Sequence, residues 1–172
     1  MERADLSSLR VLILGGKSHA LTILRSVLNN AGVKAVLMAP DTPSAIEVLS
    51  RENVSAVFFD AHAATGFGGV SFPVAVRRKA IVINPMVPLY CVYDRARRRD
   101  VEKARDNGVT DVLTAPISPR AILSKLKAPA RPFIVAQEFF GPDRRSKRRP
   151  PFMGDDRRKR TAKKAKFDFA HV

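Results

Sequence analysis

The sequence predicts an α/β fold in which a five-stranded parallel sheet carries helices on both faces, followed by an irregular basic extension. Two observations indicate the sheet and a third indicates the extension. Five short apolar runs read as buried strands. They alternate with segments that have helical periodicity or capping residues. After Pro129 the apolar periodicity ends and prolines and cations become frequent.

The strands are short apolar runs bounded by turn residues. In an open parallel sheet the working edge lies at the carboxyl ends of the strands. That edge would carry Gly15, Gly16, Asp60, Tyr93 and Ala115. The predicted strands, in chain order, are Leu9–Leu14, Val33–Met38, Val54–Phe59, Pro88–Tyr93 and Val109–Leu113.

Five helices are predicted between and after these strands. The first has Ser18 as its N-cap and stops before Gly32. The second opens at Thr42-Pro43, with Thr42 as N-cap and the proline in the first turn. A glycine-rich loop at 61–69 precedes the third helix. The last three helices are predicted at Val70–Arg78, Arg97–Asn107 and Ser118–Leu126.

Charge and composition favour a cytoplasmic protein with anionic partners. The 172-residue chain has a formal net charge of +15, and its last 44 residues carry 13 Lys and Arg against 5 Asp and Glu. Such a field favours anionic ligands and says little about fold. A single cysteine, Cys91, predicts a reducing compartment. The polar first eight residues do not resemble a signal peptide, and no apolar run is long enough for membrane insertion.

Residues 9–126 resemble the CheY-like receiver domain of bacterial response regulators, which has a flavodoxin-like fold. The resemblance rests on Asp60 after the third strand, on Gly69–Phe72 (GVSF) and on Ala104–Ser118 (ARDNGVTDVLTAPIS). It implies a degenerate receiver domain over residues 9–128, in which Asp60 is a vestigial phosphoacceptor.

The residues that receivers use for phosphotransfer are missing. Receivers have an acidic pair for Mg²⁺ after the first strand, Ser or Thr after the fourth, and Lys before the last proline. Here these positions are Gly15-Gly16, Tyr93 and Ala115. Without oxygen ligands for the cation and without the lysine, nothing neutralises a transferring phosphoryl group. We therefore expect no metal, no catalytic residues and no enzyme activity, and Asp60 is expected to cap a loop.

The extension, residues 129–172, contains one seven-residue phrase twice. Phe139–Arg145 (FFGPDRR) and Phe152–Arg158 (FMGDDRR) share the pattern aromatic, apolar, Gly, any residue, Asp, Arg, Arg. The prolines of the extension break regular structure, so it is expected to be irregular when empty and to order on binding. Its apolar residues at 133, 134, 139 and 140 are candidates to pack back on the body.

The residue types of this phrase suit a guanine nucleotide. An arginine fork donates to guanine O6 and N7, and a carboxylate accepts from N1–H and N2–H₂. Arginine planes and phenylalanine rings stack on purines, and further arginines pair with phosphate. Cyclic di-GMP has two guanines and two phosphates. The candidate binding residues are Asp143, Arg144, Arg145, Arg148, Arg149, Asp155, Asp156, Arg157, Arg158 and Phe140.

A receiver-like body without phosphorylation residues and with an arginine-rich extension resembles the Cle group, CheY-like cyclic di-GMP effectors of alphaproteobacteria. In that group the ligand binds the arginine-rich segment, and the bound protein docks on the flagellar motor switch. The resemblance implies a non-enzymatic signalling protein in chemotaxis and flagellar motility. Its partners would be cyclic di-GMP and a protein such as the motor switch.

Two other functions stay open at this stage. One is a phosphorylation-dependent single-domain response regulator. The other is a basic-tailed nucleic-acid-binding accessory protein, because such tails bind polyphosphate by counterion release. The recurring aspartates of the phrase would repel a phosphate backbone. The arginines near the start of the fourth helix are either a solvated surface or a docking surface for ligand or partner; they are Arg95, Arg97, Arg98 and Arg99.

Overall fold

The computed structural model describes residues 6–15, 18–62, 70–78, 81–127, 133–135 and 140–142. Its main sheet consists of β1 (Arg10–Leu14), β2 (Ala35–Ala39), β3 (Ala56–Asp60), β4 (Leu89–Tyr93) and β5 (Asp111–Thr114). All neighbouring strands pair in parallel. Their order is β2-β1-β3-β4-β5, which is the flavodoxin-like order of doubly wound sheets. The predicted fold class is confirmed.

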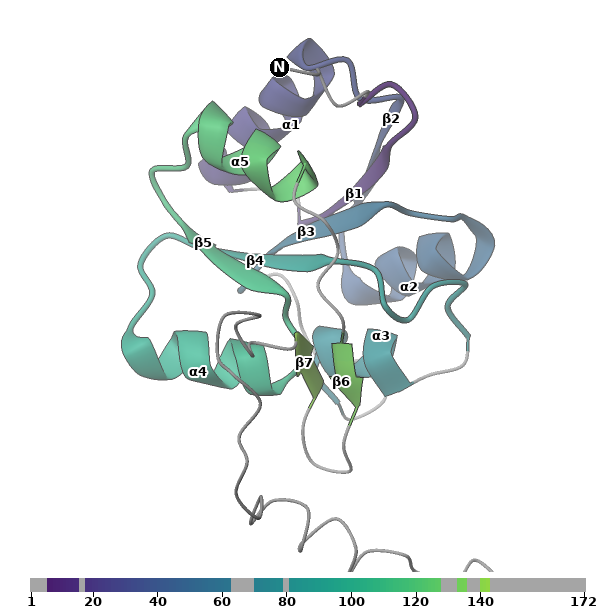
Figure 1. Cartoon of the computed structure of the whole chain (residues 1–172), viewed down its shortest axis with the longest axis vertical. Coiled ribbons are helices and arrows are strands. Elements are labelled where there is room, and N and C mark those ends of the chain that lie inside the picture. Colours follow the sequence, from purple (N-terminus) through teal and green to yellow (C-terminus); the bar gives the residue numbers. More distant parts are fainter. Residues whose placement is uncertain are drawn as a thin grey trace, which may run out of the picture.

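Five helices cover the two faces of this sheet. They are α1 (His19–Asn30), α2 (Thr42–Arg51), α3 (Phe72–Arg78), α4 (Arg98–Asp106) and α5 (Pro119–Lys127). Figure 1 shows α1 and α5 on one face and α2, α3 and α4 on the other. None of the described helices is long and apolar enough to cross a membrane.

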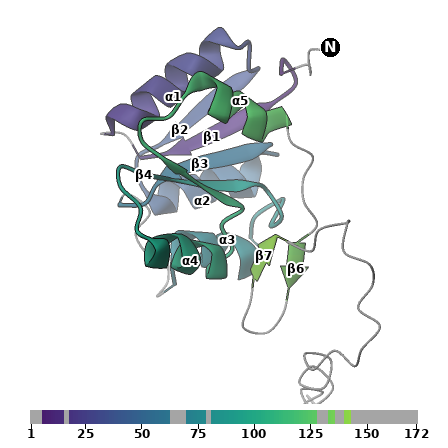
Figure 2. The same cartoon turned by 60° about the vertical axis from the view of Figure 1, so that its left-hand side comes forward.

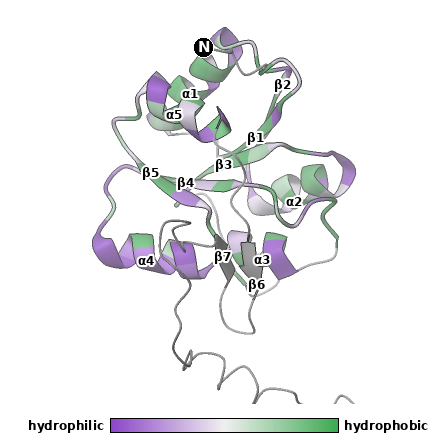
Figure 3. Cartoon of the chain, viewed as in Figure 1, coloured by the Kyte–Doolittle hydropathy of each residue, from purple (hydrophilic) through white to green (hydrophobic). Residues whose placement is uncertain are grey.

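The strands are apolar because both faces of the sheet are covered. All four residues from Val11 to Leu14 in β1 have 0% exposed surface. Successive side chains of a strand point to opposite faces. Leu12 accordingly belongs to the core cluster that contains Phe72 of α3, and Ile13 to the cluster that contains Ile122 of α5. Each such side chain contributes about 1.5–3 kcal/mol by burial. Figure 3 shows the hydrophobic strands between the more polar helices.

All five strands begin one or two residues later than predicted. For β2 and β5 the reason is that the valine predicted to start the strand closes the preceding helix. The Val33 N–H donates to Leu28 O at 3.2 Å, and the Val109 N–H donates to Ala104 O at 3.1 Å. Each valine follows a glycine with positive φ, Gly32 at 77° or Gly108 at 95°. This is the Schellman arrangement, in which glycine supplies the left-handed residue that ends a helix.

The cap of α2 also differs from the prediction. Asp41, not Thr42, is the N-cap, and its Oδ1 accepts from the Ser44 N–H at 2.9 Å. Hydrogen bonding from the side chain and then from the backbone of Ser44 lowers the pKa of the Asp41 carboxyl. Thr42 is already helical and has 0% exposed surface. Ser18 does occupy the N-cap position of α1, but its side chain makes no capping hydrogen bond.

The extension contains regular structure that the sequence did not predict. β6 (Phe133–Val135) and β7 (Phe140–Pro142) form an antiparallel pair, in which Phe133 faces Pro142. The expectation of an irregular extension was therefore wrong for these residues. Proline is tolerated at a strand end, where no further ladder bond is needed. β7 lies against α4, beside α3 (Figures 1 and 2).

A buried arginine joins α3 to two loops. Arg77 is 6% exposed, and its guanidinium donates to Val87 O at 2.8 Å, to Gly108 O at 3.1 Å and also to Pro85 O. Burial lowers the pKa of Arg77 to about 9. The side chain thus satisfies carbonyls at the entrance to β4 and at the end of α4.

Replacing Arg77 with alanine is expected to destabilise the protein by about 3 kcal/mol, because the change leaves a cavity and buried carbonyls without donors. Urea unfolding followed by circular dichroism measures the effect. The matched control is Arg25→Ala on the exposed side of α1, which should stay within about 0.5 kcal/mol of the wild type. Equal effects of the two substitutions would show that the guanidinium contacts do not stabilise the fold.

Candidate functional site

The carboxyl edge of the sheet brings together residues that the sequence placed there. Gly15 follows β1, Asp60 ends β3, Tyr93 ends β4 and Ala115 follows β5. These four strands are consecutive neighbours in the sheet. The Ala115–Pro116 peptide bond is cis. Gly16 lies outside the described residues.

Asp60 has the loop-capping contact that was expected. Its Oδ1 accepts from the backbone N–H of His62 at 2.7 Å, and its side chain is half-buried. Among the described residues, no group of three or more His, Cys, Asp or Glu side chains is placed to hold a metal ion. The carboxylate is therefore held by the loop and belongs to no such group among the described residues.

The backbone at Gly15 also departs from what a magnesium site needs. Gly15 has φ of 110°, a conformation that L-residues rarely adopt, and its N–H donates to Ala39 O at 2.9 Å. A carboxylate side chain at this position would thus require a change of backbone conformation as well as of sequence. The residues present do not fit the Mg²⁺ of a phosphotransfer site.

A hollow of about 240 Å³ lies between α3 and α4, over the ends of β3 and β4. Cys91 forms part of its floor and is 2% exposed; burial raises the pKa of the Cys91 thiol to about 12. Burial, with smaller effects of Cys91 and Asp100, raises the pKa of the Tyr93 phenol to about 12. Both groups are therefore neutral at physiological pH. The described residues that line this hollow are Phe59, Ala61, Ser71, Pro73, Cys91, Tyr93, Asp100, Lys103, Ala104, Asn107 and Val109.

Sequence reasoning missed this pocket. Its lining comes from β3, from the start of α3, from β4, from α4 and from the segment between α4 and β5. No motif links these segments, so only the fold brings them together. Tyr93 was singled out because it stands where receivers have Ser or Thr, and this was the one available signal near the pocket. The structure places its side chain, half-buried, on the pocket wall.

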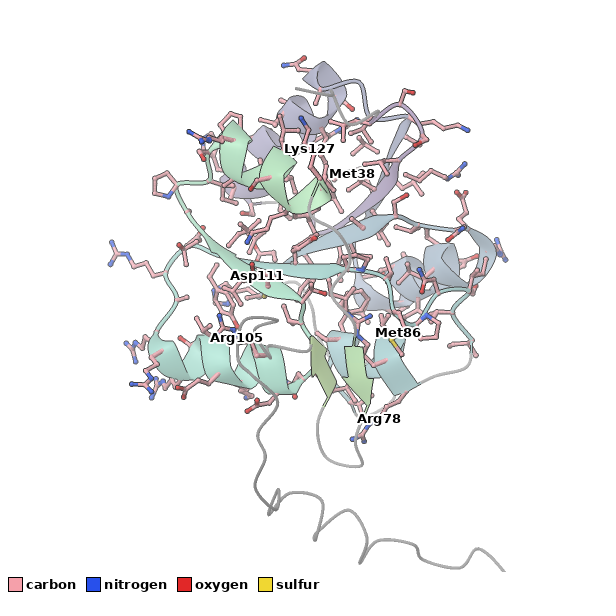
Figure 4. All side chains as sticks on the ribbon, in the orientation of Figure 1. Met38, Arg78, Met86, Arg105, Asp111 and Lys127 are labelled. Carbon is pink, nitrogen blue, oxygen red and sulfur yellow. The ribbon has the colours of Figure 1, made fainter. Side chains whose placement is uncertain are left out.

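The arginines at the start of α4 are on the surface. Arg95, Arg97, Arg98 and Arg99 are all exposed. Arg98 pairs with Glu102 at 2.8 Å, and Arg99 lies 3.9 Å from Asp100. Exposed pairs of this kind contribute little to stability. Figure 3 shows that most residues of α4 are hydrophilic, and Figure 4 shows Arg105 on the side that faces β5. A role of these arginines in docking stays a prediction.

Most of the predicted ligand-binding residues cannot be placed. Phe140 belongs to β7, of which the backbone alone is described. The following predicted site residues lie outside the described residues: Asp143, Arg144, Arg145, Arg148, Arg149, Asp155, Asp156, Arg157 and Arg158. The ligand site in the extension therefore remains a prediction, and its first charged residue, Asp143, directly follows β7 in the sequence.

No protein-family model and no curated protein matches the chain. Solved receiver domains do match its fold. The chemotaxis response regulator CheY4 of Vibrio cholerae is 18% identical, with a TM-score of 0.56 over 70% of this chain and 97% of its own. Another match is the receiver domain of a sensor histidine kinase from Pseudomonas aeruginosa, solved with a magnesium ion in its active-site cleft. It is 20% identical, with a TM-score of 0.59 over 70% of this chain and 95% of its own.

A third match comes from Saccharomyces cerevisiae. It is the co-crystal structure of a histidine phosphotransfer signalling protein and the receiver domain of its downstream response regulator. The match is 20% identical, with a TM-score of 0.57 over 70% of this chain and 88% of the matched chain. At these identities the likeness shows the fold. The body of this chain has the fold of CheY-like receiver domains, which confirms that part of the sequence resemblance. The likeness to the Cle group stays a prediction.

Placing an aspartate at Gly15 is not expected to create a magnesium site. Gly15→Asp forces an L-residue to φ of 110° and should destabilise the fold by about 1–2 kcal/mol. Urea unfolding and Mg²⁺ titration by calorimetry measure the two effects. Ser18→Asp is the matched control, because it adds the same charge near the same edge at φ of −80° and should not destabilise. A stable Gly15→Asp protein that binds Mg²⁺ would contradict the argument from the backbone.

Asp60 is expected to resist phosphorylation, because the edge lacks the cation ligands and the lysine that transfer requires. Incubation with acetyl phosphate and Mg²⁺ should leave the intact mass unchanged. A mass increase that disappears in Asp60→Asn would restore the phosphorylation-dependent function instead.

Proposed function

We propose that this chain is a non-enzymatic signalling protein that binds cyclic di-GMP through its arginine-rich extension and then docks on a protein partner. The observation that carries the proposal is the duplicated phrase, FFGPDRR and FMGDDRR. The first copy contains β7, and Asp143 is the next residue after its end. The ligand-binding chemistry is thus joined to an element that lies against α4.

The composition of the phrase favours guanine over a simple polyanion. A tail that only neutralised phosphate would need cations, whereas each copy also repeats an aromatic residue, a glycine and an aspartate. The aspartate would accept from the guanine N1–H and N2–H₂, and the arginines would donate to the Hoogsteen edge and to phosphates. Two copies suit a ligand with two guanines and two phosphates.

The body supports a role in transmitting the signal. Gly15 and the loop contact of Asp60 argue against an input by phosphotransfer. A signal can instead enter at the extension and reach α4 through β7. Ligand binding changes the conformational equilibrium only as far as its affinity differs between the two states. The extension is proposed to order around the ligand and thereby to change the surface that α4 presents.

The docking partner is proposed to be a protein, and the resemblance to the Cle group suggests the flagellar motor switch. The receiver domain from S. cerevisiae, which has the same fold, was solved with a protein partner. The exposed arginines at the start of α4 are a candidate contact for an acidic surface on the partner. No described residue favours the nucleic-acid alternative over this one.

Calorimetry with cyclic di-GMP tests the proposal. The wild type should bind at micromolar concentration and should discriminate against cyclic di-AMP. Arg144→Ala/Arg145→Ala should weaken binding by about 100-fold or more, because two charge-assisted donors are lost. Lys163→Ala/Lys164→Ala removes the same charge from the same extension outside the phrase, and Asp60→Asn alters the vestigial phosphoacceptor. Both controls should bind like the wild type.

Other outcomes would assign the extension differently. Equal affinity for both cyclic dinucleotides would remove the guanine argument. Equal weakening by the lysine and arginine pairs would indicate a purely electrostatic tail. Tight binding of duplex DNA with a steep salt dependence, without binding of cyclic di-GMP, would favour the nucleic-acid function.

A further inference from the structure

The two outer strands of the sheet differ in how they are protected. β2 and β5 lie at opposite edges, and no described strand pairs with the outer side of β2 (Figure 1). Edge strands usually carry charges, prolines or bulges that discourage pairing with another chain. In β5, Asp111 forms an ion pair with Lys125, and Thr114 is exposed. β2 has the sequence AVLMA, without a charged or polar side chain.

The apolar strand β2 is also partly exposed. Met38 has 40% of its surface exposed, and Val36 and Leu37 are half-buried, whereas the residues from Val11 to Leu14 in the neighbouring β1 have 0% exposed surface. Val36 packs against the core cluster that contains residues of α1, and Leu37 against the cluster that contains residues of α2. Both core layers of the protein therefore end at a partly uncovered apolar strand.

The backbone of β2 offers hydrogen-bonding groups on this open side. The Ala35 N–H donates to the residue before β1 at 3.3 Å, and Ala39 O accepts from the residue after β1 at 2.9 Å. A strand in a parallel ladder bonds to a given neighbour through every second residue. Ala35, Leu37 and Ala39 therefore turn their backbone groups to β1. The N–H and C=O groups of Val36 and Met38 face the open side.

The sequence of β2 is self-complementary about Leu37. Read from this residue in either direction, it has an apolar residue larger than alanine and then an alanine. When a second copy pairs antiparallel about a two-fold axis at Leu37, Val36 of each copy lies opposite Met38 of the other. These residues carry the outward-facing groups, and they would form the hydrogen-bonded pairs of an antiparallel ladder. Leu37 would then meet Leu37 of the second copy as a non-hydrogen-bonded pair, in which side chains lie closest.

We propose that β2 is the interface of a symmetric dimer, in which two copies of this chain join their sheets edge to edge. A two-fold axis makes the same patch serve both subunits, which a self-complementary strand allows. The residues that flank β2 select this register. Slipping it by two residues places the exposed Lys34 opposite Met38, or places Pro40, which has no N–H, opposite Val36. The proposal concerns β2 alone and does not depend on ligand binding by the extension.

The dimer is expected to be weak and to tighten with salt. Pairing of two strands of 5 residues gives a small contact, and small interfaces belong to transient complexes. Each chain has a formal net charge of +15. Repulsion between like charges therefore opposes association until salt screens it.

Sedimentation velocity on the full-length protein tests for the dimer. Between about 10 µM and about 1 mM chain, the measured mass should rise from that of one chain toward twice that value. The rise should begin at lower concentration when the salt concentration is raised. A protein that stays monomeric over this range, or a dimer that dissociates as salt is raised, would overturn the proposal.

Met38→Lys tests whether β2 forms the contact. It should raise the dissociation constant of the dimer by about tenfold or more, because it removes the apolar contact with Val36 and brings a cation close to Lys34 of the second copy. The matched control is Thr114→Lys, which adds the same charge at an exposed position of the opposite edge strand and should dimerise like the wild type. Circular dichroism and urea unfolding confirm that both variants fold. Equal dissociation constants of the two variants would contradict an interface at β2.

Cross-linking tests the register. Leu37 is the one residue of β2 that would face its own counterpart, whereas the two copies of Met38 would be diagonal neighbours about 7–8 Å apart. A disulfide needs Cα atoms within about 7 Å of each other. In the presence of oxidised glutathione, Leu37→Cys should therefore form a disulfide-linked dimer faster than Met38→Cys. The native Cys91 is 2% exposed, and the wild type is the control for its reaction.

Chance collisions would give the opposite order, because Met38 is the more exposed of the two positions. Faster cross-linking of Met38→Cys, or no cross-linking of Leu37→Cys beyond the wild type, would overturn the proposed pairing.

Discussion

The rest of the structure depends on the burial of the parallel sheet on both faces. Parallel strands need crossover connections, and these place helices over each face. In β1 the residues from Val11 to Leu14 are completely buried, and in β4 the residues from Leu89 to Val92 are at most 5% exposed. Because such strands have no room for polar side chains, chemistry is confined to the carboxyl edge, the loops and the outer surfaces of the helices. The pocket lies beside the carboxyl ends of β3 and β4.

The hollow between α3 and α4 follows from how little α4 buries. α4 has one buried residue, Ala104, and most of its other residues are polar or charged. α3 has seven residues. A helix that contributes a single small side chain to the core leaves space over the sheet, and the neighbouring short helix does not fill it. The basic character of α4 and the pocket beside it therefore have a common origin in the same segment of sequence.

The sequence was sufficient for the fold because the apolar runs and helix signals are local. It was less reliable at element ends, where competition between local hydrogen bonds decides: Asp41 replaces Thr42 as cap, and Val109 closes α4 instead of starting β5. Contacts between residues far apart in the chain could not be predicted from the sequence. The β6–β7 pair joins two three-residue strands among prolines, and Ser71 meets Asp100 and Lys103 at the pocket only through the fold. The residue types of the arginine phrase predict which ligand chemistry it suits, but the sequence does not predict where the phrase lies.

The weakness of the β6–β7 pair is what suits it to carry a signal. An isolated two-stranded hairpin is marginally stable in water, so three residue pairs in this arrangement depend on the support of α4. Anything that binds the docked state more tightly than the undocked one stabilises it in proportion to that difference. A strongly packed element would not respond to such a small free energy, whereas a marginal one changes its population. In the proposed function, a ligand bound by the phrase that follows β7 would act on this marginal contact with α4. The buried sheet would stay unchanged.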